Sequence, residues 1–274
     1  MCIITGPVNS VKSTKIFVAP SKTRNYQLVI YSNIVSTAAK NMMILPVPNP
    51  HTVQFEEGVM LYTNIFRDAE DSFYNPYESL SLSRGPTPGM NSDPLPVLNV
   101  GSYQASIALS VTDLTRLNAN VFNITPELIQ MLKRNYETLA MGFVCCVLRP
   151  GGNQYEPIAY THQCPTSGKL FVPTKHYHPD ARINLNSAYG TAWAMLQQGD
   201  SYYADDWDHR IYSVGTTRDS AHLNWGELYL PTQRNQMDWG QFPPEYQYTA
   251  NSKLNRWAKE GRHQNIDLEF EKAA

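Results

Sequence analysis

The sequence predicts an α+β fold: a largely antiparallel β-sheet with a few helices and an aromatic-rich C-terminal cap. Runs of β-branched and aromatic residues with short links fill most of the chain up to residue 175, and the part after it is polar and aromatic. A regular alternation of strands and helices, which would indicate a parallel sheet, is absent. We therefore expect a single domain over residues 1–274, with a sheet-rich core at 1–175 and a capping region at 176–274.

The N-terminal part predicts three consecutive strands at 15–19, 26–35 and 42–45. The polar turn at 21–25 joins the first two as a hairpin, and prolines at 46 and 48 end the third. Short links of this kind are typical of an antiparallel meander.

A weak helical pattern follows at 59–66, and strand character returns at 97–109. Between them, residues 76–96 contain five prolines, which lack the amide donor that helices and sheets use. We expect this stretch to be a loop that belongs to the same domain.

The clearest local signal in the chain is Thr125-Pro126-Glu127. A threonine N-cap, a proline at the first helical position and an acid in the first turn together mark the start of a helix. An apolar stripe continues toward Gly142 at helical spacing, formed by Leu128, Met131, Leu132 and Leu139.

The apolar run at 143–148 predicts a strand buried on both faces, with Cys145 and Cys146 on opposite sides. The following segment, 155–162, could pair back on it as a hairpin, and 169–172 predicts another short strand.

The capping region contains a helical pattern at 184–198, a strand pattern at 207–214 and a second helical pattern at 253–259. Its aromatic content suggests either a contact surface or the filling of the cap's own core. We expect two of its three later tryptophans to be core residues, the three being Trp225, Trp239 and Trp257.

Composition narrows the classes of function. With 22 Lys and Arg against 24 Asp and Glu, the chain lacks the basic excess of a nucleic-acid binder. No apolar run is long enough to cross a bilayer and no signal peptide is recognisable, so we expect no membrane partner and a cytoplasmic location or a place in a virion. The four cysteines form no CxxC pair and no disulfide framework.

Several segments together resemble an uncharacterised protein family found mainly in bacteria and some large viruses. Its members open with Met-Cys and share a segment ending in MILP-P. The matching stretches are 2–17, 27–31, 41–48, 170–178 and 206–212. The resemblance implies no activity, cofactor or partner, but it marks these positions for attention.

A candidate metal site combines His176 and His178 with Asp206, Asp208 and His209. On an extended strand, residues two apart share a face, so both imidazoles could bind one ion. An aspartate or histidine from the second segment would complete an open three-ligand site for zinc, or for non-haem iron, in a hydrolase or oxygenase. The alternative is a pair of surface histidines beside an acidic loop.

Cys2 is a second candidate. If Met1 were removed, its thiol could act as a nucleophile with its own amine as base, as in an N-terminal cysteine hydrolase. The alternative is a small buried apolar residue in a first strand. A pairing of His162 with Cys164 has less support, because nothing nearby in the sequence supplies an orienting acid or an oxyanion hole.

No complete catalytic set emerges, so the sequence favours a non-catalytic binding or assembly protein that contacts a protein partner or forms a homo-oligomer. The content of charged residues is only 17%, and a weakly charged surface is cheap to desolvate on association. The metal-dependent enzyme and the cysteine hydrolase remain the alternatives.

Overall fold

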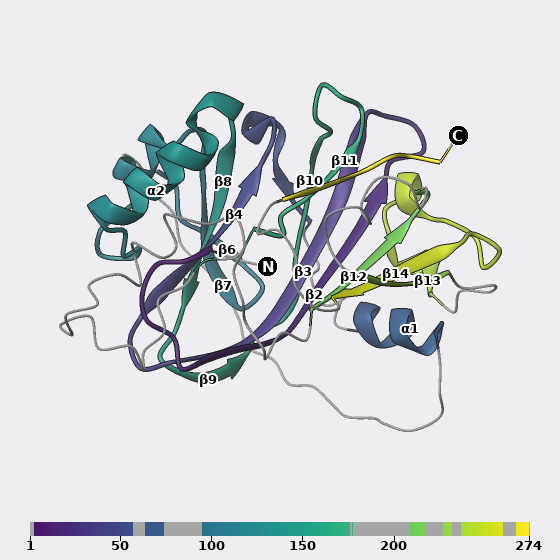
Figure 1. The fold of residues 1–274 in the computed structure, drawn as a ribbon, viewed down its shortest axis with the longest axis horizontal. Coiled ribbons are helices and arrows are strands. Elements are labelled where there is room, and N and C mark those ends of the chain that lie inside the picture. Colours follow the sequence, from purple (N-terminus) through teal and green to yellow (C-terminus); the bar gives the residue numbers. More distant parts are fainter. Residues whose placement is uncertain are drawn as a thin grey trace.

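Two β-sheets pack face to face, and helical segments cover their outer faces (Figure 1). The computed structural model of the protein describes residues 3–56, 64–73, 95–175, 177, 209–216, 227–231, 237–259 and 267–273. Within this part of the chain, nearly all strand pairs are antiparallel and two α-helices occur. The predicted α+β class with a largely antiparallel sheet is therefore confirmed.

The first sheet has five strands, and each of its neighbouring pairs is antiparallel. In spatial order they are β1 (Ile3–Ile4), β4 (Asn41–Val47), β8 (Gly142–Leu148), β7 (Tyr103–Ala108) and β6 (Leu98–Val100).

The second sheet has eight strands and contains one parallel pair, β2 with β12. Seven of them follow the order β13 (Glu227–Pro231), β14 (Leu254–Lys259), β12 (His209–Val214), β2 (Ser10–Pro20), β3 (Tyr26–Thr37), β10 (Ile158–Gln163) and β5 (Gln54–Phe55). The eighth, β9 (Gly151–Gln154), pairs with the far end of β3. A separate two-stranded sheet joins β11 (Leu170–Val172) to β15 (Leu268–Phe270).

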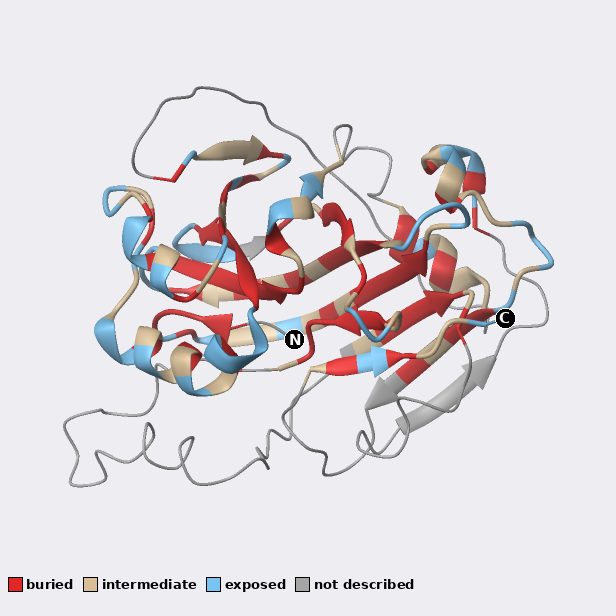
Figure 2. Cartoon of the chain, turned by 90° about the horizontal axis from the view of Figure 1, so that it is seen from above, coloured by how far each residue is buried: buried red, intermediate tan, exposed pale blue. Residues whose placement is uncertain are grey.

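Strand β3 has apolar side chains on both of its faces. Val29, Tyr31 and Val35 point into the interior between the sheets, whereas Leu28 and Ile30 point to the outer face. Because helical layers cover the outside, both sets are buried, and Figure 2 shows buried residues through the middle of both sheets. The interior is filled from both sheets by side chains such as Ile16, Val18, Met43, Leu45, Val144, Cys146, Ile211 and Trp257.

Helix α2 (Pro126–Tyr136) covers the outer face of the five-stranded sheet. The Thr125 hydroxyl accepts the Leu128 N–H at 3.3 Å, so the predicted N-cap is confirmed. Leu128 and Leu132 are buried in the same cluster as Cys145, while Cys146 faces the interior, as expected from strand alternation. The helix ends at Tyr136, earlier than predicted, and Leu139 lies in a following 3₁₀ turn with 62% of its surface exposed.

The outer face of the eight-stranded sheet is covered by α1 (Ile65–Asp71) and by the segment 237–248. The Trp239 and Phe242 rings both pack on Phe17 of β2, with centroids 6.3 and 5.8 Å away. Trp257 is fully buried and Trp239 is 7% exposed, so both are core residues as expected. Within the described residues, 3₁₀ helices occur at Pro50–Thr52, Thr112–Arg116, Glu137–Leu139, Trp239–Gln241 and Pro244–Tyr246.

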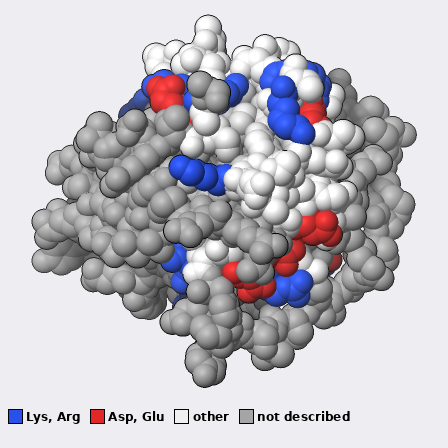
Figure 3. Space-filling model, turned by 90° about the vertical axis from the view of Figure 1, so that its right-hand side faces the viewer, with Lys and Arg blue, Asp and Glu red and all other residues white. Residues whose placement is uncertain are grey.

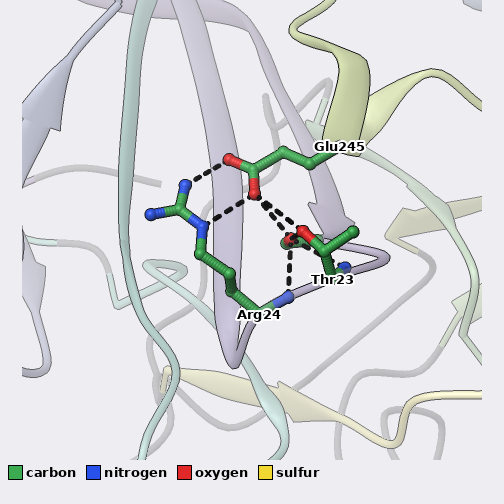
Figure 4. Close-up of polar contacts among 4 residues, drawn as sticks. Thr23, Arg24 and Glu245 are labelled. Carbon is green, nitrogen blue, oxygen red and sulfur yellow. Dashed lines mark hydrogen bonds and ion pairs between the residues drawn. The ribbon is translucent and has the colours of Figure 1, made fainter.

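A polar network ties the turn of the β2–β3 hairpin to this covering segment (Figure 4). Arg24 forms a two-pronged ion pair with the Glu245 carboxylate, which also accepts hydrogen bonds from the Ser21 and Thr23 hydroxyls. The hydrogen bonds from Arg24 lower the pKa of Glu245. The network closes the end of the sandwich where β2 stops and β3 begins.

Three predictions about local structure are wrong. The third N-terminal strand, β4, does not continue the meander: it lies between β1 and β8 in the other sheet, and its two apolar faces, like those of β3, suit a central position in either sheet. Segment 155–162 does not pair back on β8; β10 pairs with β3 and β5 in the eight-stranded sheet. Segment 253–259 is not a helix but strand β14, held between β12 and β13.

The capping region thus contributes strands as well as cover. The predicted helix at 59–66 corresponds in part to α1, which begins at Ile65. Most of the proline-rich stretch 76–96, the helical pattern at 184–198 and Trp225 lie outside the described residues. Within those residues, no helix is both long enough and apolar enough to span a membrane.

Candidate functional site

Most candidate side chains lie outside the described residues. This holds for Cys2, His176, His178, Asp206 and Asp208. For His209 the structure describes the backbone at the start of β12. Ile3 and Tyr177, which adjoin Cys2, His176 and His178 in the chain, are described.

A single backbone bridge links the surroundings of Cys2 and the two histidines. Ile3 forms a parallel bridge with Tyr177, and the Ile4 N–H donates to the Tyr177 carbonyl oxygen at 2.7 Å. Both Ile3 and Tyr177 are buried in the cluster beneath α2. Two candidates that the sequence treats as separate, Cys2 and the pair flanking Tyr177, therefore adjoin the same bridge.

Strand β1 also contacts the opposite sheet across the interior. Ile4 points into the interior and pairs with Met43 of β4. The Met43 sulfur accepts a hydrogen bond from the Asn33 side-chain amide of β3 at 3.6 Å. Ile4 thus lies in the interior, while its neighbour Ile3 and Tyr177 face the α2 layer.

Opposite Asn33, β2 contains a β-bulge. The pairing of Lys12 with Ile34 and of Lys15 with Ser32 leaves Ser13 and Thr14 together facing Asn33. Ser13 has φ of 49°, a left-handed conformation that costs a non-glycine residue about 1 kcal/mol or more. Bulges re-aim side chains and are over-represented next to active sites.

Strand β12 begins beside this bulge. It runs parallel to β2, and His209 is the register partner of Thr14. The bulge, Asn33 and Met43 adjoin one another at the end of the interior away from the β2–β3 turn. We call this region the site end and define it by Ile4, Thr14, Tyr31, Asn33 and Met43.

Three polar side chains are buried at the site end. Thr14, Tyr31 and Asn33, which we call the interior polar cluster, are 1%, 0% and 0% exposed. The Asn33 amide donates to the Tyr31 hydroxyl at 3.4 Å. Sequence reasoning missed this cluster, because the run 26–35 reads as one apolar strand; the available signal was the Tyr31-x-Asn33 spacing, which gives both side chains one face.

A second polar group holds the chain next to Tyr177. The Asp267 carboxylate accepts the Lys175 N–H at 2.7 Å and the Tyr136 hydroxyl at 2.8 Å. The Lys175 ammonium in turn donates to the Asn135 side chain of α2 at 2.5 Å. Both carboxylate oxygens are engaged, so Asp267 fixes the backbone just before His176.

Burial raises the pKa of Asp267, while its hydrogen bonds to Lys175 and Tyr136 and the positive charges of Lys175 and the chain's amino terminus lower it in part. Burial also raises the pKa of Tyr136, and the negative charge of Asp267 adds to the shift. The Tyr136 hydroxyl therefore stays protonated and keeps its role as donor.

The described cysteines are poor nucleophiles. Cys145, Cys146 and Cys164 are buried, and burial raises the pKa of the Cys145 and Cys164 thiols. His162 is fully buried, and burial lowers its pKa to about 4. A neutral imidazole beside a protonated buried thiol does not provide the activated pair that His162 and Cys164 would need.

The described side chains form no group of three or more His, Cys, Asp or Glu residues that could hold a metal ion. The residues that would hold zinc or iron are the predicted ones at 176, 178, 206, 208 and 209. The metal site therefore stays a prediction.

The described surface offers little apolar area for self-association. Its exposed large hydrophobic residues are Leu109 and Leu139. Figure 3 shows acidic and basic side chains distributed among uncharged ones on one face. An assembly interface would have to draw most of its apolar area from elsewhere on the chain.

No family model matches the chain, and no solved structure matches it either. The interpretation of the site end therefore depends on the chemistry of its own residues.

Proposed function

We propose that this protein is a cysteine-dependent acyl hydrolase whose nucleophile is Cys2 and whose active site is the site end of the interior. One observation carries the proposal: the Ile3–Tyr177 bridge puts the neighbours of a thiol and of two imidazoles side by side. Thiolate and imidazole are the pair that nucleophilic cysteine catalysis uses.

The proposed reaction begins when the His176 imidazole takes the proton of the Cys2 thiol. The thiolate attacks the carbonyl carbon of an ester or amide, a sulfur–carbon bond forms, and the carbonyl electron pair moves to oxygen. Collapse of this intermediate expels the leaving group, which takes the proton from the imidazolium. Water then attacks the acyl-enzyme, releases the carboxylic acid and restores the thiol.

The parallel direction of the bridge supports this pairing. Cys2 precedes Ile3 and His176 precedes Tyr177, so both adjoin the bridge from the same side. Since Ile3 and Tyr177 face the α2 layer, the proposal requires Cys2 and His176 to share the opposite face, toward which Ile4 points. The Asp267 group provides a fixed frame for this arrangement.

Alkylation with iodoacetamide, mapped by peptide mass spectrometry across a pH series, tests the proposal. We expect Cys2 to react first, with a half-maximal rate below the ordinary cysteine pKa of about 8.5, because a neighbouring imidazolium stabilises the thiolate. His176→Asn should return this midpoint to the ordinary value. Cys164→Ser is the matched control and should change neither rate nor midpoint.

Two results would contradict the proposal. One is a Cys2 that reacts no faster in the folded protein than in the urea-unfolded chain. The other is a reaction midpoint that His176→Asn leaves in place.

A metal centre is the second candidate, supported by the residue types at positions 176, 178, 206, 208 and 209. Elemental analysis of protein purified without chelator would detect one equivalent of zinc or iron, lost in His178→Ala. An absence of metal at this stoichiometry would remove the candidate.

The binding or assembly function predicted from composition is tested by light scattering at increasing protein concentration. A monomer throughout would contradict self-association. A stable oligomer that lacks a reactive Cys2 would favour it over the hydrolase.

A further inference from the structure

We propose that the outer face of the eight-stranded sheet binds the dianionic phosphoryl group of a phosphate monoester or of free phosphate. The site is formed by Lys15, Arg210 and Arg256 next to α1, and we call these side chains, together with Glu70 and Tyr212, the basic cluster. This face is opposite to the interior in which the site end lies, so the inference does not depend on the proposed function.

Strand alternation and register place the three cations on one face. Tyr212 is buried in the outer cluster beneath α1, and Arg210, two residues before it in β12, shares its face. Lys15 of β2 is the register partner of Arg210, and Arg256 of β14 is the register partner of Tyr212. The side chains of register partners are neighbours on the same face of a sheet, so the cluster extends across three adjacent strands.

A single carboxylate oxygen engages two of the cations. The Glu70 Oε1 atom of α1 accepts hydrogen bonds from the Lys15 ammonium at 2.8 Å and from the Arg210 guanidinium at 3.1 Å. The Tyr212 hydroxyl donates to the same oxygen at 3.0 Å. Burial opposes the charge of Glu70, but these donors and the positive charges of Lys15 and Arg210 outweigh it and lower the pKa of Glu70. Glu70 therefore carries one negative charge that two cations already share.

The third cation has no anion. The Arg256 guanidinium carbon lies 5.1 Å from the centroid of the Phe73 ring, and this ring contacts that of Tyr212 at 6.2 Å. Among the described residues, the buried Arg256 Nε has no hydrogen-bond partner, and Arg256 forms no ion pair. A ring face attracts the charge but accepts no hydrogen bond from the guanidinium edge. Because arginine cannot lose its proton to relieve this cost, the unpaired N–H points to an anion supplied from outside.

Charge and exposure define the ligand. Three positive charges against one negative charge leave the basic cluster with an excess of two, which matches the charge of a phosphate monoester near neutral pH. Guanidinium groups bind phosphate oxygens through paired hydrogen bonds. The Lys15 and Arg210 side chains are 24% and 34% exposed, so a small molecule can reach them from solvent.

Isothermal titration calorimetry in phosphate-free buffer tests the inference with phenyl phosphate, inorganic phosphate and phenyl sulfate. We expect phenyl phosphate to bind the wild type and phenyl sulfate, similar in shape but with one charge fewer, to bind more weakly. Tighter binding of phenyl phosphate than of inorganic phosphate would identify an ester as the ligand. Equal or tighter binding of inorganic phosphate would identify the free ion, and either result supports the phosphoryl site.

Substitutions at Arg256 separate its fork from its charge. Arg256→Gln should weaken the binding of phenyl phosphate at least about tenfold, as for the loss of a charge-assisted hydrogen bond. Arg256→Lys keeps the charge without the paired donors and should restore only part of the affinity. Arg116→Gln is the matched control, because it removes one positive charge from an exposed pair with Asp113 on the other sheet, and it should bind as the wild type does.

Glu70→Gln tests the competition between the ligand and the internal carboxylate. Without that charge, Lys15 and Arg210 are free to bind the phosphoryl group, so we expect tighter binding than in the wild type. A merely structural role of the basic cluster predicts the opposite, since loss of Glu70 would then disorganise it. Thermal unfolding monitors the fold of each variant, and Glu70→Gln and Arg256→Lys still decide if Arg256→Gln is unstable.

Four results would overturn the inference. They are a wild type that binds neither phosphate probe, equal binding in Arg256→Gln and the wild type, phenyl sulfate binding as tight as that of phenyl phosphate, and weaker binding in Glu70→Gln. None of them bears on the reactivity of Cys2, whose alkylation tests the proposed function separately.

Discussion

Gln27 and Thr14, two buried polar side chains at opposite ends of the interior between the sheets, differ in their hydrogen bonding. At the end closed by the β2–β3 turn, the Gln27 side chain donates to the Phe171 carbonyl oxygen and accepts the Phe171 N–H, both at 2.7 Å. At the site end, the Thr14 hydroxyl has no partner within the described residues, and the backbone beside it is left-handed at Ser13.

This difference separates polar groups that stabilise the fold from polar groups that weaken it. The Gln27 side-chain amide pairs with the Phe171 N–H and carbonyl oxygen of β11. It thus supplies the two hydrogen bonds that the backbone of a neighbouring strand would otherwise make. Thr14 contributes no such bond. Native structures contain few such unsatisfied groups, and among the described residues they include the Thr14 hydroxyl at the site end and the His162 Nε2 atom at the closed end.

The largest expected effect is at the closed end. Gln27→Leu leaves the Phe171 N–H and carbonyl oxygen buried without partners, so we expect the free energy of unfolding to fall by about 3 kcal/mol or more. Urea denaturation measures it, and Gln104→Leu on the exposed side of β7 is the control. A loss below about 1 kcal/mol would break the comparison, because Gln27 would then contribute no more than an ordinary hydrogen bond.

The next effect is a dependence of stability on pH that comes from His162, also at the closed end. Its folded pKa of about 4 lies below the ordinary 6.5, because burial opposes the charged form. Below pH 6.5 the unfolded chain takes up a proton at this position and the folded chain does not, until about pH 4. Stability should fall by about 3 kcal/mol as the pH decreases through this window.

Urea titrations at pH 7, 5.5 and 4 measure this effect against His162→Phe, which cannot titrate. The variant should lose less stability than the wild type on acidification. Parallel pH profiles for the two proteins would show that His162 does not titrate as its burial implies.

At the site end we expect a substitution to raise the free energy of unfolding rather than lower it. Thr14→Val removes an unsatisfied hydroxyl and should raise the free energy of unfolding by about 1 kcal/mol. Thr166→Val, at an exposed position, should leave it within about 0.5 kcal/mol. Destabilisation by Thr14→Val would mean that the hydroxyl does serve the fold, and the contrast between the ends would lose its basis.

The smallest effect concerns the network that closes the hairpin end. Glu245→Gln should cost only about 0.5 kcal/mol, because the Arg24 side chain is 47% exposed and solvent screens the pair. The difference from the wild type should shrink further in 1 M NaCl. A loss that salt does not reduce would assign the effect to the Ser21 and Thr23 hydrogen bonds rather than to the ion pair.

Local signals in the sequence predict local structure well here. Thr125 and Pro126 predict the start of α2 because capping depends on a few adjacent residues. The assignment of β4 to the opposite sheet was not predictable, since pairing partners are chosen by packing over long separations. The segment 253–259 fits a helix as well as a strand when taken alone, and its position between β12 and β13 decides for the strand.

The candidate site likewise combines features that local sequence predicts with features that depend on long-range pairing. Residue types and spacing predict which side chains could react, such as Cys2 and His176, but not that their neighbours form one bridge. The interior polar cluster depends on a bulge, and a bulge is a property of the register between two strands. Single residues at positions 14 and 33 carry no sign of it in the sequence.

The place of β12 in the eight-stranded sheet has a consequence for how the chain folds. This strand lies between β2 and β14, so β2 of the N-terminal hairpin gains its second neighbour only once residues 209–214, in the last third of the chain, have been synthesised. Until then, one edge of β2 is unpaired, and such edges attract other strands. Contacts between such distant positions also slow folding. The nascent protein therefore has a long interval in which a chaperone must protect the unpaired edge of β2 from aggregation.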